Sequence, residues 1–515
     1  MFRRRSAVTG AVVLVLTLTL CLLDWHGLDY PAQIYRVGLV RRQGFSLWDA
    51  NWYGGHYTPA YGIIVPWVAS VVGLPATAVV STLGSVVLFE RLLTDARLPH
   101  VVTGTVAFTL MMLVNMYEGR IPFAFGVLLG LLTMTLARRG RWRLAAGATV
   151  LTTLASPVAG AFVALAFGAW AMSLPHGSRR DLVRTPQGGL SVVALLSTTG
   201  MSLAFPEGGY FPYNVADMLI AVGAAAVVWW TLPHSLSTIR WAFLLAGLLA
   251  LPLFVIPNPM GGNLSRLAVI GAPLLCAVPR RRLLVHAAVC LILLGQQAKP
   301  LLELPEAVAD PTSKHSYYQP LVNELKDRTS GPVRLEIPNT ESHWEAAYVA
   351  RDFPLARGWE RQLDLRYNAL LYDAMMTSDQ YHGWLVENGV SYVAIPDADL
   401  ESEALHEVEI ARNAPYLRQM WRNEHWQLFR VVDSPSLVTG PARVVKMAAD
   451  LVRLDVFRSD PVILRMRYAS HLMVVRGRGC ITQGEDGWTE LLPLTTGRMT
   501  LRMRLLPTHL DYCSP

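Results

Sequence analysis

The strongest constraint on the fold comes from eleven apolar runs in the first 300 residues. Each run approaches the ~20 residues that an α-helix needs to cross a ~30 Å hydrocarbon core, although some are rather short. Such runs predict a polytopic α-helical membrane protein, because a helix satisfies its own backbone hydrogen bonds within a bilayer. The runs cover residues 7–23, 76–92, 100–117, 121–137, 143–155, 158–174, 189–204, 213–231, 240–256, 266–278 and 283–297.

The composition of the chain agrees with this class. Hydrophobic residues make up 52% of it and charged residues only 16%, whereas charged residues form about a quarter of a soluble domain. The net charge of +7 comes from short Arg clusters between apolar runs, so it does not indicate a nucleic-acid partner. Cys480 and Cys513 lie in the polar tail and could form a disulfide in an oxidising compartment. No Cys/His spacing typical of a metal site occurs, and we predict neither a metal nor a cofactor.

The Arg clusters also predict the orientation of the chain, because Lys and Arg concentrate in cytoplasmic loops. Residues 3–5 place the N-terminus inside, and clusters at 138–143, 179–184 and 280–282 mark later inside loops. All of them are inside together only if the ambiguous apolar run 59–74 does not cross. We therefore interpret this run as a juxtamembrane or re-entrant helix on the outer face. The protein is then expected in the plasma membrane, with a cytoplasmic N-terminus and an extracytoplasmic C-terminal domain.

Three parts of the chain differ in their patterns. Residues 1–300 are expected to form a transmembrane domain with a long first outer loop, 24–75. Residues 301–432 mix helix-like and strand-like stretches, which predicts an α/β domain. Residues 433–515 are strand-like with Gly/Asp turns at 477–487, which predicts a β domain such as a small sandwich. Helices are expected at 318–326, 363–376 and 379–388, and strands at 333–337, 391–395, 426–432, 462–468, 472–475 and 499–504.

A polar segment rich in Trp, Tyr, Gly and His follows the first apolar run, at residues 24–61. Asp29 lies in it, just before Tyr30-Pro31 and near a predicted membrane boundary. Its carboxylate could act there as a general base on an acceptor hydroxyl. Alternatively, Asp29 caps the helix that is expected to begin near Pro31.

The same segment contains Trp52-Tyr53-Gly-Gly-His56. Its glycines permit a close approach of the backbone to a ligand. Trp52 and Tyr53 could stack on a sugar ring, and His56 could bind a phosphate or a hydroxyl. The alternative is an interfacial aromatic belt with a tight turn.

Two arginines on predicted outer loops break the positive-inside rule. Arg120 follows Glu118 in Glu-Gly-Arg, and Arg266 follows Asn263 in Asn-Leu-Ser-Arg. Either guanidinium could hold the phosphate of a lipid carrier, with Glu118 orienting Arg120. The alternative for Glu118 and Arg120 is a helix-end salt bridge.

The predicted outer domain has one concentrated charged stretch. Arg357, Trp359 and Asp364 could grip a glycan acceptor there, or they could dock the domain onto the membrane part. No GxSxG, P-loop, GxGxxG or HExxH motif occurs, so the sequence does not favour hydrolase, nucleotide or zinc chemistry.

The first outer loop, with Asp29, Tyr35-Arg36 and then Trp52 to His56, resembles the polytopic glycosyltransferases of the GT-C class. Within that class it is most similar to the actinobacterial and archaeal membrane proteins named as related to 6-pyruvoyl-tetrahydropterin synthase. The resemblance covers roughly residues 7–432. It implies inverting transfer from a polyprenyl-phosphate sugar, with Asp29 as the base. Asp29 is followed by Tyr-Pro and not by a second acid, so no metal is carried over.

These observations together predict a membrane glycosyltransferase. It would move a sugar from a polyprenyl-phosphate donor to a cell-envelope glycan or lipid acceptor on the outer face, in contact with membrane lipid. The residues expected to bind substrate are His56, Trp52, Tyr53, Arg120, Glu118, Arg266 and Asn263. The alternatives are a transporter or lipid-linked-glycan flippase, and a non-catalytic envelope scaffold with the same fold. A transporter is less expected, because the apolar runs hold almost no ionisable residues at their centres.

Overall fold

The computed structural model describes residues 2–175, 179–279 and 282–504. The chain divides into two compact units, which are described separately: Met1–Gln33 with Pro59–Ala309, and Ile34–Thr58 with Asp310–Pro515. Helix α2 (Tyr30–Gln43) therefore begins in the first unit and ends in the second. Residues 34–58 lie with the C-terminal unit, although the sequence pattern groups them with residues 1–300.

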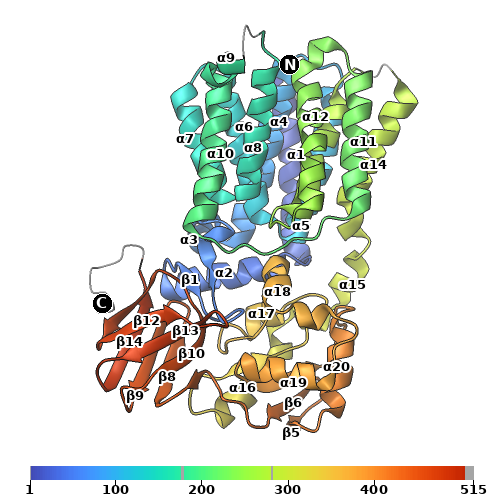
Figure 1. The fold of residues 1–515 in the computed structure, drawn as a ribbon. Coiled ribbons are helices and arrows are strands. Elements are labelled where there is room, and N and C mark those ends of the chain that lie inside the picture. The colour runs from blue at the N-terminus through green and yellow to red at the C-terminus, as the bar shows by residue number, and fades with distance from the viewer. Residues whose placement is uncertain (1, 176–178, 280–281, 505–515) are drawn as a thin grey trace. The chain divides into compact units, whose positions relative to one another are not determined.

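The first unit is a helical bundle (Figure 1). The eleven expected apolar runs all fall on helices. These are α1 (Phe2–Leu23), α4 (Leu74–Asp95), α5 (Val101–Glu118), α6 (Ile121–Arg138), α7 (Trp142–Ala155), α8 (Pro157–Met172), α10 (Pro186–Ala204), α11 (Val215–Thr231), α12 (Ser237–Val255), α13 (Ala268–Ala277) and α14 (Leu283–Ala298). The ambiguous run contains α3 (Ile64–Val72), and short helices α9 (Arg179–Arg184), η2 (His234–Leu236), η3 (Gly261–Leu267), η4 (Lys299–Leu301) and α15 (Leu304–Ala309) complete the unit.

Several of these helices have the length and composition of membrane spans. Within the described residues, six segments qualify: Ser6–Leu23, Leu74–Asp95, Val101–Glu118, Ile121–Arg138, His234–Val255 and Leu283–Ala309. Helices α8 and α11 are apolar but shorter. Helix α13 has ten residues, or roughly 15 Å at 1.5 Å per residue, about half of a hydrocarbon core. The membrane location is thus supported, whereas eleven crossings stay a prediction.

Small residues let the helices of the bundle approach closely. A Cβ at Gly126 of α6 would lie 2.6 Å from the Ala159 side chain of α8, and a Cβ at Gly104 of α5 would lie 2.7 Å from that of Ala277 in α13. Close contact between small residues is a usual source of helix association in membranes, where the hydrophobic effect does not draw helices together.

The second unit contains an α/β part, as expected. Its sheet has the strand order β3-β4-β6-β5, with β3 parallel to β4 and the other pairs antiparallel. Tyr381, Leu385 and Val393 are fully buried in its core. The strands are β3 (Arg334–Glu336), β4 (Val390–Pro396), β5 (Leu417–Arg422) and β6 (Trp426–Val431), and the helices are η5 (Pro311–Ser313), α16 (His315–Arg328), α17 (Glu345–Tyr348), α18 (Arg361–Tyr367), η6 (Ala369–Tyr372), α19 (Ser378–Glu387) and α20 (Ala404–Asn413).

The same unit contains two four-stranded antiparallel sheets, with orders β12-β13-β10-β7 and β11-β14-β9-β8. Burial alternates along β9 and β10, so each sheet has one buried face. The strands are β7 (Val438–Thr439), β8 (Ala442–Ala448), β9 (Leu451–Val456), β10 (Val462–Arg467), β11 (Leu472–Arg476), β12 (Gly479–Gln483), β13 (Trp488–Pro493) and β14 (Gly497–Met503). Strand β12 falls where only turns were expected. Cys513 lies outside the described residues.

Residues 34–58 are an integral part of this second unit. They form the short pair β1 (Trp48–Asp49) and β2 (His56–Tyr57), followed by η1 (Thr58–Ala60). The backbone N–H of Ala50 donates to the carbonyl of Ala449 at 3.0 Å, and the N–H of Leu355 donates to the carbonyl of Asn51 at 2.8 Å. The segment is thus hydrogen-bonded to both the α/β part and the β part.

Candidate active site in the helical unit

A tight turn joins α5 to α6 and carries two of the expected site residues. Helix α5 ends at Glu118, Gly119 follows in the left-handed conformation with φ of 85°, and Arg120 precedes α6. The Arg120 N–H donates to the Asn115 carbonyl at 3.0 Å, as in a glycine-terminated helix end. Pro122 stands at the start of α6, where its missing N–H costs nothing. The turn therefore presents Glu118 and Arg120 side by side.

The segment that carries Asp29 lies directly on this turn. The Gly27 N–H donates to the Tyr117 carbonyl at 2.9 Å, and the Asp29 N–H donates to the Glu118 carbonyl at 2.9 Å. A Cβ at Gly27 would come within 2.6 Å of Glu118 Oε2, so only glycine fits without a shift. The backbone therefore fixes Asp29 next to the turn.

Four charged side chains meet at this place, all within the helical unit. Asp29 Oδ2 lies 3.3 Å from Arg120 Nε and 3.5 Å from a terminal nitrogen of Arg266, which comes from η3. Glu118 Oε1 lies 3.2 Å from the other end of the Arg120 guanidinium. Their side chains are 5–19% exposed. We call Asp29, Glu118, Arg120 and Arg266 the charge cluster.

Two carboxylate oxygens of the cluster are not used by the protein. Both ion pairs of Asp29 go to Oδ2, and within the described residues Oδ1 has no hydrogen bond or ion pair. Glu118 Oε2 is buried and likewise lacks a hydrogen-bond partner there. A buried acceptor without a donor is costly in a folded protein, so Glu118 Oε2 indicates a place for a ligand.

The cap that was considered for Asp29 is not made. Helix α2 begins at Tyr30, immediately after Asp29, but among the described hydrogen bonds none joins the Asp29 carboxylate to an N–H of α2. The side chain points instead to the two arginines.

The two arginines differ in their electrostatic surroundings. Burial alone would lower the pKa of Arg120, but Asp29 and Glu118 outweigh burial and raise it. For Arg266, burial and then the neighbouring Arg120 lower the pKa, and Asp29 only partly offsets them. The protein's carboxylates therefore stabilise the cationic form of Arg120 more than that of Arg266.

Two neighbours of the cluster were missed in the sequence. Tyr61 acts electrostatically on both arginines. The Arg266 guanidinium lies 5.9 Å from the centre of the Phe123 ring. Both residues are uncharged and lie outside the charged motifs that drew attention to the cluster.

Asn263 lies in the same 3₁₀ helix as Arg266 and is half-buried. Its backbone N–H donates to the Met260 carbonyl at 2.9 Å. No side-chain contact between Asn263 and the charge cluster is found among the described residues, so the structure groups four of the expected site residues and leaves Asn263 beside them.

Trp52, Tyr53 and His56 belong to the other unit, where they are buried. Trp52 is 0% exposed, and its Nε1 donates to the Ala346 carbonyl at 3.0 Å. Tyr53 donates its hydroxyl hydrogen to the Glu360 carbonyl at 3.1 Å. Neither ring has an open face for a sugar in this structure.

His56 is equally enclosed. Burial, and then Arg36, lowers the pKa of His56 to about 3. The imidazole is therefore neutral, and its 3.7 Å approach to the Glu360 carboxylate is not an ion pair. Glu360 is instead paired with Arg36, while burial raises the pKa of that carboxyl.

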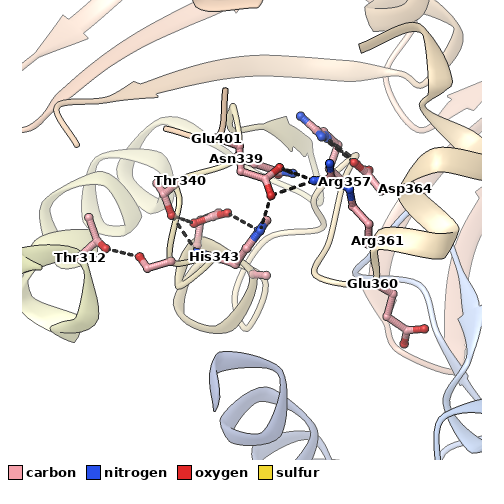
Figure 2. Close-up of polar contacts among 12 residues, drawn as sticks. Thr312, Asn339, Thr340, His343, Arg357, Glu360, Arg361, Asp364 and Glu401 are labelled. Carbon is pink, nitrogen blue, oxygen red and sulfur yellow. Dashed lines mark hydrogen bonds and ion pairs between the residues drawn. The ribbon is translucent and has the colours of Figure 1, made fainter. Parts of the chain in front are cut away.

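The charged stretch after Leu355 is largely internal (Figure 2). Arg357 and Asp364 are 3% and 1% exposed and are joined at 2.5 Å, with Glu407 3.4 Å from the other side of the guanidinium. This pair is therefore buried within the α/β part.

A second polar group in Figure 2 is nearer the surface of the same unit. Glu401 accepts from His343 at 3.1 Å and from Arg361 at 2.9 Å. Burial would lower the pKa of His343, but Glu401 and Glu345 raise it to about 10. His343 and Arg361 in turn outweigh burial and lower the pKa of Glu401 to about 2.

Within the described ranges, no three His, Cys, Asp or Glu side chains are grouped as a metal site.

No protein-family model and no curated protein matches this chain. Among solved structures it is similar to the arabinofuranosyltransferase AftD from mycobacteria, with 17% identity, a TM-score of 0.46, and coverage of 84% of this chain and 40% of that chain. It is also similar to the oligosaccharyltransferase of Archaeoglobus fulgidus, with 10% identity, a TM-score of 0.40, and coverage of 76% and 69%.

The chain thus spans about two fifths of the length of the AftD structure that it matches. Both similar proteins are glycosyltransferases by name.

Proposed function

We propose that this chain is a membrane glycosyltransferase that moves a sugar from a polyprenyl-phosphate donor to a cell-envelope acceptor. The observation that carries the proposal is the charge cluster. Asp29, Glu118, Arg120 and Arg266 come from three distant segments and meet where apolar helices begin and end. Such a place can hold a phosphate while the isoprenoid chain of the same molecule lies among apolar helices.

In this proposal Arg266 binds the donor phosphate. Its only carboxylate neighbour within ion-pair distance, among the described residues, is Asp29 at 3.5 Å. Arg120 is paired with both Asp29 and Glu118, at 3.3 and 3.2 Å, so fewer of its N–H groups are open to a ligand. A guanidinium suits this task, because it stays charged and makes paired hydrogen bonds to phosphate oxygens.

Asp29 is the proposed base, and Arg120 positions it. With Oδ2 held by the arginines, Oδ1 is free to accept the proton of an acceptor hydroxyl. The acceptor oxygen then attacks the anomeric carbon, and the bond from that carbon to the phosphate oxygen breaks. The phosphate leaves with the bonding electron pair, and Arg266 stabilises its developing charge. A single displacement of this kind inverts the anomeric centre.

Glu118 and Asn263 complete the proposed site. The buried oxygen of Glu118 accepts a hydrogen bond from a substrate hydroxyl, and Asn263 lines the approach beside Arg266. We leave Trp52, Tyr53 and His56 out of the proposed site, because their side chains are buried inside the second unit. The distribution of Arg clusters in the sequence supports an extracytoplasmic location for this chemistry.

The test uses the full chain in lipid nanodiscs, radiolabelled polyprenyl-phosphate sugars and a cell-envelope preparation. Asp29→Asn should reduce sugar transfer by about 10²–10⁴-fold, the usual contribution of a general base. Asp24→Asn is the matched control, since Asp24 lies in the same segment but is 87% exposed, and it should retain full activity. Full activity of Asp29→Asn would remove the proposed base. Donor binding without transfer by the unmodified chain would favour the flippase or the scaffold.

A further inference from the structure

The second unit contains a groove of about 760 Å³ that is distinct from the charge cluster. This volume lies within the range of about 300–1,000 Å³ that is typical of ligand sites. The end of α2, the segment after α16, the loop before Leu355, the β8–β9 turn and β14 form its walls. Six cations line it, against two carboxylates, Asp352 and Asp450; the cations are Arg42, Lys326, Arg351, Lys446, Arg453 and Arg502.

The two carboxylates are already in use. Lys326 Nζ lies 2.7 Å from Asp352, and Arg502 Nε lies 3.2 Å from Asp450. The other four cations make no ion pair or hydrogen bond within the part of the chain that the structure describes. Arg42 acts on the buried Asp49 only through its charge. The groove therefore carries an excess of about four positive charges that the protein does not balance.

Two of these cations are placed directly against each other. Lys446 of β8 and Arg453 of β9 are paired residues in the antiparallel ladder, both exposed and both lining the groove. Like charges in directly opposed positions destabilise a sheet. An anion between them would turn this repulsion into two attractive contacts.

The uncharged walls of the groove suit a polyhydroxylated ligand. Thr329 and Ser330 offer hydroxyls, Gln43 offers an amide, and Gly331 exposes its backbone. The large exposed hydrophobic side chains of the described residues are all outside the lining. Apolar side chains that insert into a bilayer strengthen the binding of a protein to a lipid surface, and this groove offers no large exposed ones among the described residues, so a soluble ligand fits it better.

We propose that this groove binds an acidic glycan, that is, a saccharide chain that bears carboxylate or phosphate groups. The cations meet the acidic groups, and the hydroxyl, amide and backbone groups meet the sugar hydroxyls. The inference goes beyond the proposed glycosyl transfer and does not depend on Asp29 or Arg266.

The experiment measures binding of an oligogalacturonate to the full chain in lipid nanodiscs by titration calorimetry. A maltodextrin of equal length is the neutral probe, and polyglutamate is the acidic probe without sugar rings. The oligogalacturonate should bind, more weakly as salt is raised because salt screens exposed charges, and it should bind better than either other probe. Equal binding of maltodextrin would overturn the role of charge, and equal binding of polyglutamate would overturn the assignment to a glycan.

Charge reversal locates the site. Lys446→Glu with Arg453→Glu should weaken oligogalacturonate binding by about a hundredfold, since two charge-assisted contacts are lost and each is worth around a factor of ten. Arg418→Glu with Arg422→Glu is the matched control, because both are exposed arginines of β5 outside the groove, and it should leave binding unchanged.

The milder pair Lys446→Gln with Arg453→Gln covers the case in which charge reversal disturbs folding. This pair relieves a like-charge contact, so the chain should melt no lower than the parent while losing affinity. Unchanged affinity in a folded glutamine pair would overturn the proposal, whatever the outcome of the sugar-transfer assay.

Discussion

Replacing Arg266 with glutamine should weaken the binding of polyprenyl phosphate more than replacing Arg120 does. Arg266 has a single carboxylate neighbour, Asp29 at 3.5 Å, whereas Arg120 is held by two. A hydrogen bond to a charged group is worth about 1.5–3 kcal/mol. Losing one such contact to the phosphate corresponds to a Kd that rises about 10- to 150-fold in Arg266→Gln.

The same geometry predicts the opposite order for thermal stability. Without Arg120, Glu118 loses its ion pair, and Asp29 keeps only the 3.5 Å contact to Arg266. Leaving a buried charge without its partner costs up to about 3–5 kcal/mol, and less here because the side chains are partly exposed. Arg120→Gln should therefore melt several degrees lower than Arg266→Gln.

The assay is a fluorescence titration of undecaprenyl phosphate into the full chain in nanodiscs, together with melting curves of the same samples. Arg418→Gln, an exposed strand arginine of the second unit, should change neither quantity. If the two site variants lost affinity equally and melted alike, the distinction between a phosphate-binding and a positioning arginine would be wrong.

Two further predictions concern stability. Gly119→Ala should lower the melting temperature by a few degrees, because Gly119 has φ of 85° and a Cβ there would lie 2.4 Å from the Tyr30 nitrogen. This combination costs more than about 1 kcal/mol. Gly147→Ala is the control: it lies in open space within α7 and should be neutral or stabilising, and equal effects of the two variants would contradict the close approach at Gly119. Glu401→Gln should lower the stability of the fold most between about pH 4.5 and 6.5. The stability that His343 contributes is complete below its unfolded pKa and is lost as pH rises toward about 10. The stability that Glu401 contributes is complete above its unfolded pKa and is lost as pH falls toward about 2. Melting curves from pH 3 to 10 check this, and a difference that does not depend on pH would refute the pairing.

The sequence predicted the helical unit well because long apolar runs have one stable arrangement in a bilayer. The sequence also drew attention to Asp29, Glu118, Arg120 and Arg266 as candidates, since charged residues next to apolar runs stand out. Their meeting could not be derived, because it depends on the backbone bonds of Gly27 and Asp29 to the α5–α6 turn.

The packing of residues 34–58 could not be predicted from the sequence. Trp, Tyr, Gly and His occur both in open binding loops and in packed hairpins, and the pattern does not say which. In the structure Trp52 bonds to Ala346, almost three hundred residues away, and no local signal predicts such a partner. The run 266–278 was expected to cross the bilayer, but its helix α13 has only ten residues and is too short to span a bilayer alone.

The most direct test of the central claim is photo-crosslinking with a polyprenyl phosphate that carries a photoreactive group next to the phosphate. The full chain in nanodiscs is irradiated, and the modified peptides are mapped by mass spectrometry. The account predicts adducts in residues 24–33, 115–123 and 261–267, and their loss when unlabelled polyprenyl phosphate competes. Competed adducts confined to residues 310–504 would contradict it.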